Sequence, residues 1–245
     1  MKLCDVIPEN EDSWDDKTII EIDVDWAHDE VIADTINLIS KYNVDTTWFA
    51  THDSAIVKSL QSDSNFEVGI HPNFMPLLRG DDSNGRNFEE VIDKLLNLFP
   101  DAKCSKGHAL VDSSAIIAYL TAVGITHDNT MFVDAPAVRP LCPWRLWTDM
   151  IRVPLCWEDD YACVSPYENQ FSNLHQEKSG LRVFGFHPLH IYLNTESLSR
   201  YEEVKSFAGS DISRLRTMRY DGIGTRTRFL ELLEKMSGNT ELKSL

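Results

Sequence analysis

The segment from Thr18 to Glu30 limits the possible folds of this chain more than any other. It starts with alternating apolar and acidic residues, the pattern of a β-strand, and continues into a polar stretch and a helix. Successive strand side chains point to opposite faces, so Glu21, Asp23 and Asp25 would share one face. A solvated edge strand could carry these carboxylates, but in a buried strand unpaired charges are costly. A metal ion bound by one carboxylate, with a second acting as a base beside it, would offset that cost.

Strand and helix patterns alternate along the rest of the chain, which is typical of an α/β fold with a mainly parallel sheet. The predicted strands cover 19–25, 45–50, 66–70, 103–107, 151–156 and 181–186, and a further strand starts at 125–126. The predicted helices cover 29–42, 54–61, 88–99, 115–123 and about 227–236. We expect residues 1–245 to form one domain, with residues 1–17 as a loose acidic leader.

Composition narrows the class of partner and the compartment. The net charge of −16 argues against nucleic acid or an anionic membrane as the main partner. The five cysteines are odd in number and form no close pair, which favours reduced thiols over a disulfide framework. No signal peptide or apolar run of membrane-spanning length is present. A cytoplasmic protein without membrane insertion is therefore expected.

Polar candidates for a site follow the ends of the predicted strands. They are Asp23, Asp25, His71, His108, Trp157, Asp159 and His187. Barrel-type α/β enzymes carry their catalytic groups at this end of the strands. The shared position is a stronger argument than any one motif, because each residue also has a structural interpretation. The aspartates could be capped by backbone or basic groups, and a histidine could simply bond to backbone.

Their chemistry suggests distinct roles. One of Asp23 and Asp25 could bind a metal while the other accepts a proton from its water. His71 and His108 carry imidazoles, which are common zinc ligands. A histidine at position 187 could protonate a leaving group.

Three further residues have two interpretations each. Trp144 and Trp157 could form walls of a sugar pocket through their apolar ring faces, or could be ordinary packing. His190, in the sequence His-Pro-Leu-His, is expected to support the site from behind or to belong to the core.

Five segments, taken in order, resemble the polysaccharide deacetylases, the NodB-type domain of carbohydrate esterase family four. Within that family the likeness is to a divergent, WbmS-like branch associated with surface-polysaccharide gene clusters. The segments are Ile-Asp-Val-Asp-Trp-Ala at 22–27, Glu-Val-Gly-Ile-His-Pro-Asn-Phe at 67–74, Lys-Gly-His-Ala-Leu at 106–110, Val-Pro-Leu-Cys-Trp-Glu-Asp-Asp at 153–160 and Phe-His-Pro-Leu-His at 186–190.

The resemblance implies a distorted seven-stranded (β/α) barrel and metal-dependent removal of an acetyl group from an N- or O-acetylated sugar. By position, Asp23 matches the general base of the family and Asp25 its metal-binding aspartate. His71 matches the first metal-binding histidine, and His187 matches the catalytic acid.

The chain departs from the family pattern at two positions. Met75 stands where members usually have a second metal-binding histidine, and Lys106 stands where they usually have an arginine. His108 is the preferred third ligand, with Asn73 in reserve. Zn²⁺ is the expected ion.

The expected substrate is an acetylated sugar or sugar conjugate used in surface-polysaccharide biosynthesis. A cytoplasmic enzyme would act on a nucleotide-linked or lipid-linked unit. Besides the metal ligands, the residues expected to contact it are Asn73, Trp157, Asp159 and His190. Two alternatives remain: hydrolysis of another small C–N substrate such as a formyl group or cyclic amide, and a catalytically inactive carbohydrate-binding protein.

Overall fold

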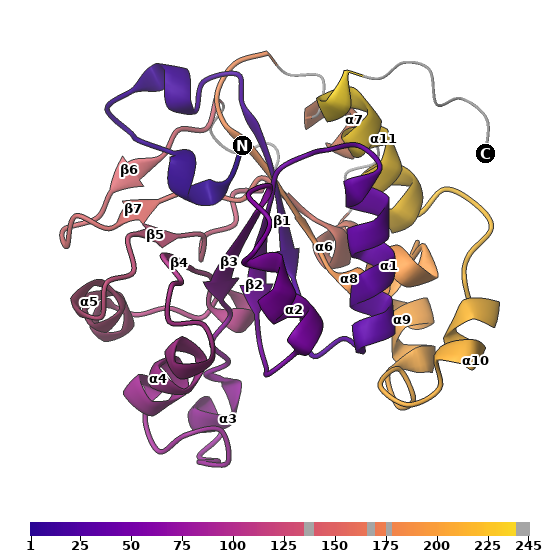
Figure 1. Ribbon diagram of the computed structural model, residues 1–245, viewed down its shortest axis with the longest axis horizontal. Coiled ribbons are helices and arrows are strands. Elements are labelled where there is room, and N and C mark those ends of the chain that lie inside the picture. The colour runs from indigo at the N-terminus through magenta and orange to yellow at the C-terminus, as the bar shows by residue number, and fades with distance from the viewer. Residues whose placement is uncertain (135–139, 166–169, 175–177, 239–245) are drawn as a thin grey trace.

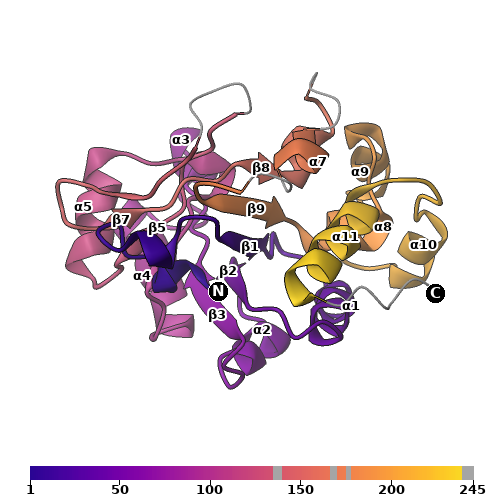
Figure 2. The ribbon, with the colours of Figure 1, turned by 90° about the horizontal axis from the view of Figure 1, so that it is seen from above.

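A curled, mainly parallel β-sheet forms the centre of the molecule, and helices pack around its outer face (Figure 1, Figure 2). The structure is a computed structural model and describes residues 1–134, 140–165, 170–174 and 178–238. The strands are β1 (Thr18–Asp23), β2 (Thr46–Ala50), β3 (Phe66–Ile70), β4 (Cys104–Ser105), β5 (His127–Asp128), β6 (Trp144–Arg145), β7 (Ile151–Arg152), β8 (Trp157–Glu158) and β9 (Arg182–Phe186).

The sheet order in this described part is β6-β7-β5-β4-β3-β2-β1-β9-β8, and only the β6–β7 pair is antiparallel. β7 and β8 lie on one continuous segment. The N–H of Leu155 donates to Met131 O at 2.8 Å on the β5 side, and that of Cys156 donates to Val183 O at 2.9 Å on the β9 side. This segment therefore bends the sheet into a barrel-like shape. The expected seven strands correspond to the nine observed when β6 is set aside and β7 and β8 are taken as one interrupted strand.

The helices are α1 (Asp29–Ser40), α2 (Ala55–Leu60), α3 (Met75–Leu78), α4 (Phe88–Leu98), α5 (Ser114–Ala122), α6 (Asp159–Ala162), α7 (Gln170–Leu174), α8 (Pro188–Leu193), α9 (Leu198–Val204), α10 (Ile212–Thr217) and α11 (Thr225–Ser237). Short 3₁₀ turns are η1 (Leu3–Asp5), η2 (Glu11–Ser13) and η3 (His108–Leu110). The five predicted helices are α1, α2, α4, α5 and α11, and their ends lie within two residues of the prediction. The strand predicted to start at 125–126 is β5, which starts two residues later, at His127.

Alternation along β1 divides the core into two layers. Ile20 and Ile22 are buried with the outer helices in the larger apolar cluster. Ile19 belongs to a second cluster inside the curled sheet, together with Phe49 and Val183. Glu21 and Asp23 follow Ile19 on the inner face, so β1 carries its carboxylates along the barrel interior toward the carboxyl end of the strands.

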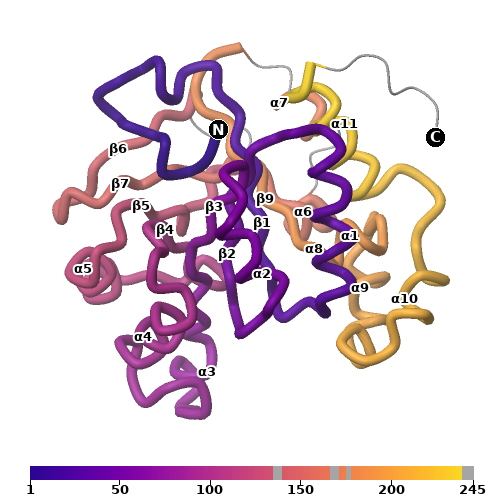
Figure 3. The backbone as a smooth tube through the Cα atoms, in the orientation of Figure 1, coloured from indigo at the N-terminus to yellow at the C-terminus, as the bar shows by residue number. Residues whose placement is uncertain are grey.

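The N-terminal residues pack into this interior cluster, which corrects the prediction of a loose leader. Leu3 and Val6 are completely buried and contact the inner cluster. The ring Nε2 of His127 lies 3.0 Å from Val6 O. Farther along, Arg145 pairs with Glu9 at 2.6 Å, and Figure 3 shows this segment beside β6 and β7. The buried side chains of Leu3 and Val6 thus hold residues of the N-terminal segment against the barrel, although most of their neighbours are polar or acidic. That residues 1–245 form one domain remains a prediction.

All five cysteines are free, as the sequence suggested. No helix among the described residues is long and apolar enough to cross a lipid bilayer.

Candidate active site

The carboxyl ends of three parallel strands bring Asp23, His71 and His187 to one cavity. These residues end β1, follow β3 and follow β9, respectively. The cavity has a volume of about 280 Å³, and all three side chains line it. His108 also lines this cavity, in η3 just after β4. The structure thus places together the strand-end residues that the sequence singled out separately.

Asp25 reaches the cavity by a route that the sequence did not predict. β1 ends at Asp23, and Asp25 and Trp26 both have positive φ angles, 43° and 55°. The chain therefore leaves the strand in a left-handed turn, and simple alternation does not place Asp25. The N–H of Trp26 donates to Thr51 Oγ1 at 3.0 Å and helps to hold this turn.

Asp25, His71 and His108 form a compact group of donor atoms. Asp25 Oδ1 lies 3.3 Å from His71 Nε2 and 3.3 Å from His108 Nδ1, and the two ring nitrogens are 3.3 Å apart. The Nδ1–H of His71 donates to Lys106 O at 2.7 Å, which leaves Nε2 with a free lone pair facing the other two atoms. A backbone carbonyl is a usual partner for the outer nitrogen of a metal-bound histidine.

This group fits a zinc-sized cation. Ligand atoms bonded at about 2.0–2.1 Å with tetrahedral angles lie roughly 3.3–3.4 Å from one another. Among the described residues, buried Asp25 Oδ1 has no hydrogen-bond partner. Burial disfavours the charged form of His71, yet Asp23 and Asp25 raise the pKa of His71 above its ordinary value. The site therefore has a surplus of negative charge that a cation would balance.

His187 is held by a buried carboxylate on its far side. Asp159 is completely buried, at the start of α6, and accepts hydrogen bonds from His187 Nδ1 at 2.6 Å and from the His187 N–H at 2.9 Å. Burial opposes protonation of the ring, but Asp159 raises the pKa of His187 well above its ordinary value. His187 Nε2 faces the site, 3.5 Å from Asp25 Oδ2 and 3.8 Å from Asp23 Oδ2.

A buried lysine neutralises the carboxylates on the inner face of β1. Lys106 Nζ donates to Asp23 at 2.6 Å, and to Glu21 and Glu158 at 2.7 Å each. Burial raises the pKa of Glu21 well above its usual range, and the nearby Asp23 charge adds to this. Asp23 is also buried, but His71, Lys106 and His187 lower the pKa of its carboxyl. The two shifts favour the ionised form of Asp23 and the protonated form of Glu21.

Sequence reasoning missed the role of Lys106 and of its partners Glu21 and Glu158. The sequence correctly indicated that a positive charge must lie beside Glu21 and Asp23. We assigned that charge to a metal ion and did not identify Lys106 as its source. Lys106 was noted merely as a replacement for the arginine of the family. Lys106 holds Glu21 in the barrel interior. β9 has a glycine opposite Glu21, because a Cβ at Gly185 would collide with Glu21 Oε1.

Three of the four residues expected to contact substrate lie elsewhere. Trp157 is 1% exposed and packs against Phe184 and Phe186, so the prediction of a sugar-pocket wall was wrong. Asp159 has no exposed surface and orients His187. Asn73 Oδ1 accepts from the Met75 N–H at 2.9 Å, at the start of α3, and Asn73 does not line the cavity.

Two residues from those predictions remain. His190 does line the cavity, and its ring stacks on Tyr201 with centroids 4.8 Å apart. Its contact with substrate stays a prediction. Trp144, the other tryptophan considered for a pocket wall, lies in β6 outside the cavity lining.

Comparison with known proteins assigns the family. The model of the WbmS-like polysaccharide deacetylases matches residues 20–205. The chain belongs to the WbmS-like polysaccharide deacetylase family. This membership supports a hydrolase that removes acetyl groups, and it agrees with the curled parallel sheet and the strand-end site. The matched region begins within β1 and ends just after α9, so it contains every residue of the site described above.

One solved structure supports the same assignment, and a second shares the fold. A Bordetella bronchiseptica protein, WbmS, described as a candidate polysaccharide deacetylase involved in O-antigen biosynthesis, is 35% identical with a TM-score of 0.87. The match covers 96% of this chain and 97% of that one. A candidate polysaccharide deacetylase from Mycobacterium smegmatis shares the fold at 15% identity and a TM-score of 0.51, over 85% of this chain and 92% of that one. The comparison with curated proteins gave no match.

Proposed function

We propose that this member of the family is a metal-dependent deacetylase that hydrolyses an N- or O-acetyl group on a sugar. The observation that carries the proposal is the triangle of Asp25 Oδ1, His71 Nε2 and His108 Nδ1, with sides of 3.3 Å. These three atoms would hold the ion, and Zn²⁺ is the ion that we propose. The absence of a histidine at position 75 does not leave the site short of a ligand, because His108 supplies the third donor.

A bound ion would polarise the acetyl carbonyl and lower the pKa of a water molecule in the site. The chain supplies the proton transfers. Asp23 is ionised, and its Oδ1 has no hydrogen-bond partner among the described residues, so it can accept the proton of the attacking water. Lys106 holds the other oxygen of the same carboxylate, which fixes its orientation.

His187 is the proposed general acid. Its Nδ1 is occupied by Asp159, so the proton available to a leaving amine or alkoxide is the one on Nε2, which faces the cavity. Asp159 keeps the ring protonated and prevents it from rotating. Asp23 as the base and His187 as the acid, with Nε2 of the ring 3.8 Å from Asp23 Oδ2, would serve the two halves of acyl hydrolysis.

The proposed substrate is an acetylated sugar unit of a surface polysaccharide. Two observations support it: the family match, and the relation at 35% identity to a protein described as involved in O-antigen biosynthesis. A cavity of about 280 Å³ lies at the small end of the usual range for ligand sites. We therefore infer that one sugar unit enters it, either free or as the end of a nucleotide-linked or lipid-linked conjugate. The cytoplasm is the compartment that we propose, because such a conjugate would be deacetylated before export.

Acetate release tests this function. Chelator-treated protein, with and without added Zn²⁺, would be incubated with acetylated monosaccharides, nucleotide-linked sugars and lipid-linked sugars. We expect release of acetate only from the metal-loaded protein. Release of formate or opening of a cyclic amide, without acetate release from any sugar, would instead identify a different C–N hydrolase. Metal-loaded protein that binds sugars but hydrolyses none would contradict the proposal in favour of a binding protein.

A further inference from the structure

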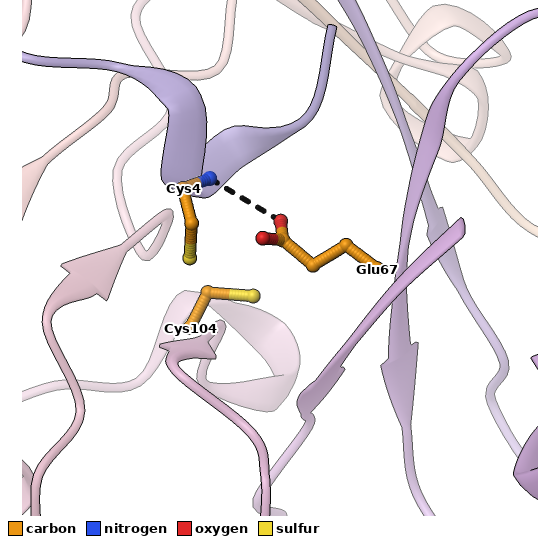
Figure 4. A group of neighbouring side chains, drawn as sticks. All are labelled: Cys4, Glu67 and Cys104. Atoms are coloured by element: carbon orange, nitrogen blue, oxygen red, sulfur yellow. Dashed lines mark hydrogen bonds between the residues drawn. The ribbon is translucent and has the colours of Figure 1, made fainter. Parts of the chain in front are cut away.

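A second group of metal-binding side chains lies at the other end of the barrel. It contains Cys4 of η1, Glu67 near the start of β3 and Cys104 at the start of β4, with donor atoms that all lie within 4.8 Å of one another. Figure 4 shows the two thiols and the carboxylate converging. Glu67 and His71 are four residues apart on β3, or about 13 Å along an extended strand. The two groups therefore cannot share one ion.

The three donors are held in place by the surrounding chain. Glu67 Oε2 accepts hydrogen bonds from Thr47 Oγ1 at 2.9 Å and from the Cys4 N–H at 3.3 Å. The N–H of Leu3 donates to the same Thr47 hydroxyl at 2.9 Å, and the Leu3 side chain is completely buried. η1 is thus anchored at Leu3 and at Cys4 itself, so little reorganisation would be needed to bind an ion.

β3 leaves space for the buried thiol. A Cβ at Gly69 would lie 2.5 Å from Cys104 Sγ and 2.6 Å from Cys104 O, too close for any other residue without a shift. Gly69 lies between Glu67 and His71 on the same face of the strand. Two donors come from strands of the sheet, whose positions are fixed by the parallel ladder.

The protonation of the pair is uneven. The hydrogen bond from Cys104 outweighs burial and, with one from His127, lowers the pKa of the Cys4 thiol. Burial raises the pKa of the Cys104 thiol well above its ordinary value. An ion that bound both sulfurs would displace the thiol protons.

We propose that Cys4, Glu67 and Cys104 form a second cation site, selective for a thiophilic divalent ion such as Zn²⁺. Two thiolates favour zinc over magnesium or calcium, and a carboxylate oxygen is a common further zinc ligand. Cys4 and Glu67 are only half-buried, so an ion can reach the site from solvent. The ion would link η1 to β3 and β4 and fasten the N-terminal segment to the base of the barrel.

Cobalt spectroscopy separates this site from the one at the strand ends. Thiolate ligands give Co²⁺ an intense charge-transfer absorption in the near ultraviolet, whereas nitrogen and oxygen ligands do not. Reduced, chelator-treated full-length protein would be titrated with Co²⁺. We expect the band to reach its full height with one ion at this site, to disappear in Cys4→Ser and Cys104→Ser, and to persist in a His71→Ala, His108→Ala double variant.

Matched controls keep the result interpretable. Cys142 is exposed and outside the group, so Cys142→Ser should retain the band in full. Substitution of residues that merely support metal ligands typically costs about 10- to 100-fold in affinity, so Glu67→Gln should weaken Co²⁺ binding at least roughly tenfold while the band remains. Circular dichroism would check that Cys104→Ser folds, and half-buried Cys4 provides the independent variant.

Thiol protection provides a second readout on the unmodified chain. We expect added Zn²⁺ to slow the reaction of the half-buried Cys4 thiol with a thiol reagent, and to leave the exposed Cys142 reactive. Absence of the cobalt band in the wild type, or its survival in both Cys4→Ser and Cys104→Ser, would overturn the proposal. So would rapid oxidation of Cys4 and Cys104 to a disulfide that Zn²⁺ does not slow. None of these three results would bear on the deacetylase proposal, which uses other residues.

Discussion

The two ends of the barrel interior carry different chemistry on the same strands. At the carboxyl end, β3 and β4 lead to histidines that meet Asp25 around an open cavity. At the amino end, the same strands carry Glu67 and Cys104, and Leu3 and Val6 cover the interior. Nitrogen and oxygen donors beside a cavity suit hydrolysis, whereas thiols under a packed segment suit a structural ion. On these two strands, the position of a residue along the strand therefore determines whether its side chain faces the open cavity or the packed base of the barrel.

Loss of a ligand at the cavity should have the largest effect. We expect His71→Ala to reduce acetate release to background and to lower the metal content of the strand-end site, because only two of the three donors remain. His28→Asn is the control, since that ring only caps the first turn of α1, a role that asparagine can keep, and does not line the cavity. Wild-type activity in His71→Ala would show that the strand-end site is not needed for catalysis. The functional contrast between the two ends of the barrel would then be wrong.

Loss of the proposed base should come next. We expect Asp23→Asn to reduce kcat/KM by about 10²- to 10⁴-fold while metal content stays unchanged, because the variant keeps the shape but cannot accept a proton. Steady-state kinetics and elemental analysis would measure both quantities. Asp12→Asn changes an exposed carboxylate and should have no effect. Loss of metal together with activity would mean that Asp23 is a ligand and not the base.

The amino end should respond through stability instead. Leu3→Ala removes a completely buried side chain, and we expect the free energy of unfolding to fall by about 2–5 kcal/mol. Ile7→Ala, at a position 47% exposed, should change it by less than about 0.5 kcal/mol. Denaturant unfolding measures both. Equal, small effects would indicate that residues 1–17 are the loose leader predicted from the sequence.

The smallest expected effect is a shift in pH dependence. Asp159 raises the pKa of His187, so the acid stays protonated, and activity is kept, until the pH rises through that elevated value. In Asp159→Asn this support is lost, and the alkaline limb of the pH–kcat profile should move to lower pH. The acid limb, which reflects Asp23, should stay in place. An unmoved alkaline limb would show that a group other than His187 is the acid.

Local patterns predicted most of the fold. α1 and α4 have strong helical periodicity, and β3 matched its predicted range in full. Helix and strand periodicity both depend only on residues close together in the sequence, so a single sequence is enough to detect them. The strand-end histidines were found for the same reason. In contrast, Lys106 pairs with Glu21 across 85 residues, and a single sequence carries no sign of that contact. Likewise, Trp157 followed a strand-end motif, but its buried ring is placed by packing with aromatic residues of β9.

The most direct test of the central claim is anomalous diffraction from crystals grown with Zn²⁺. We expect an ion within about 2.0–2.3 Å of Asp25 Oδ1, His71 Nε2 and His108 Nδ1, at the carboxyl ends of the strands. An ion bound elsewhere in the cavity without these three atoms, or no ion there at all, would contradict it.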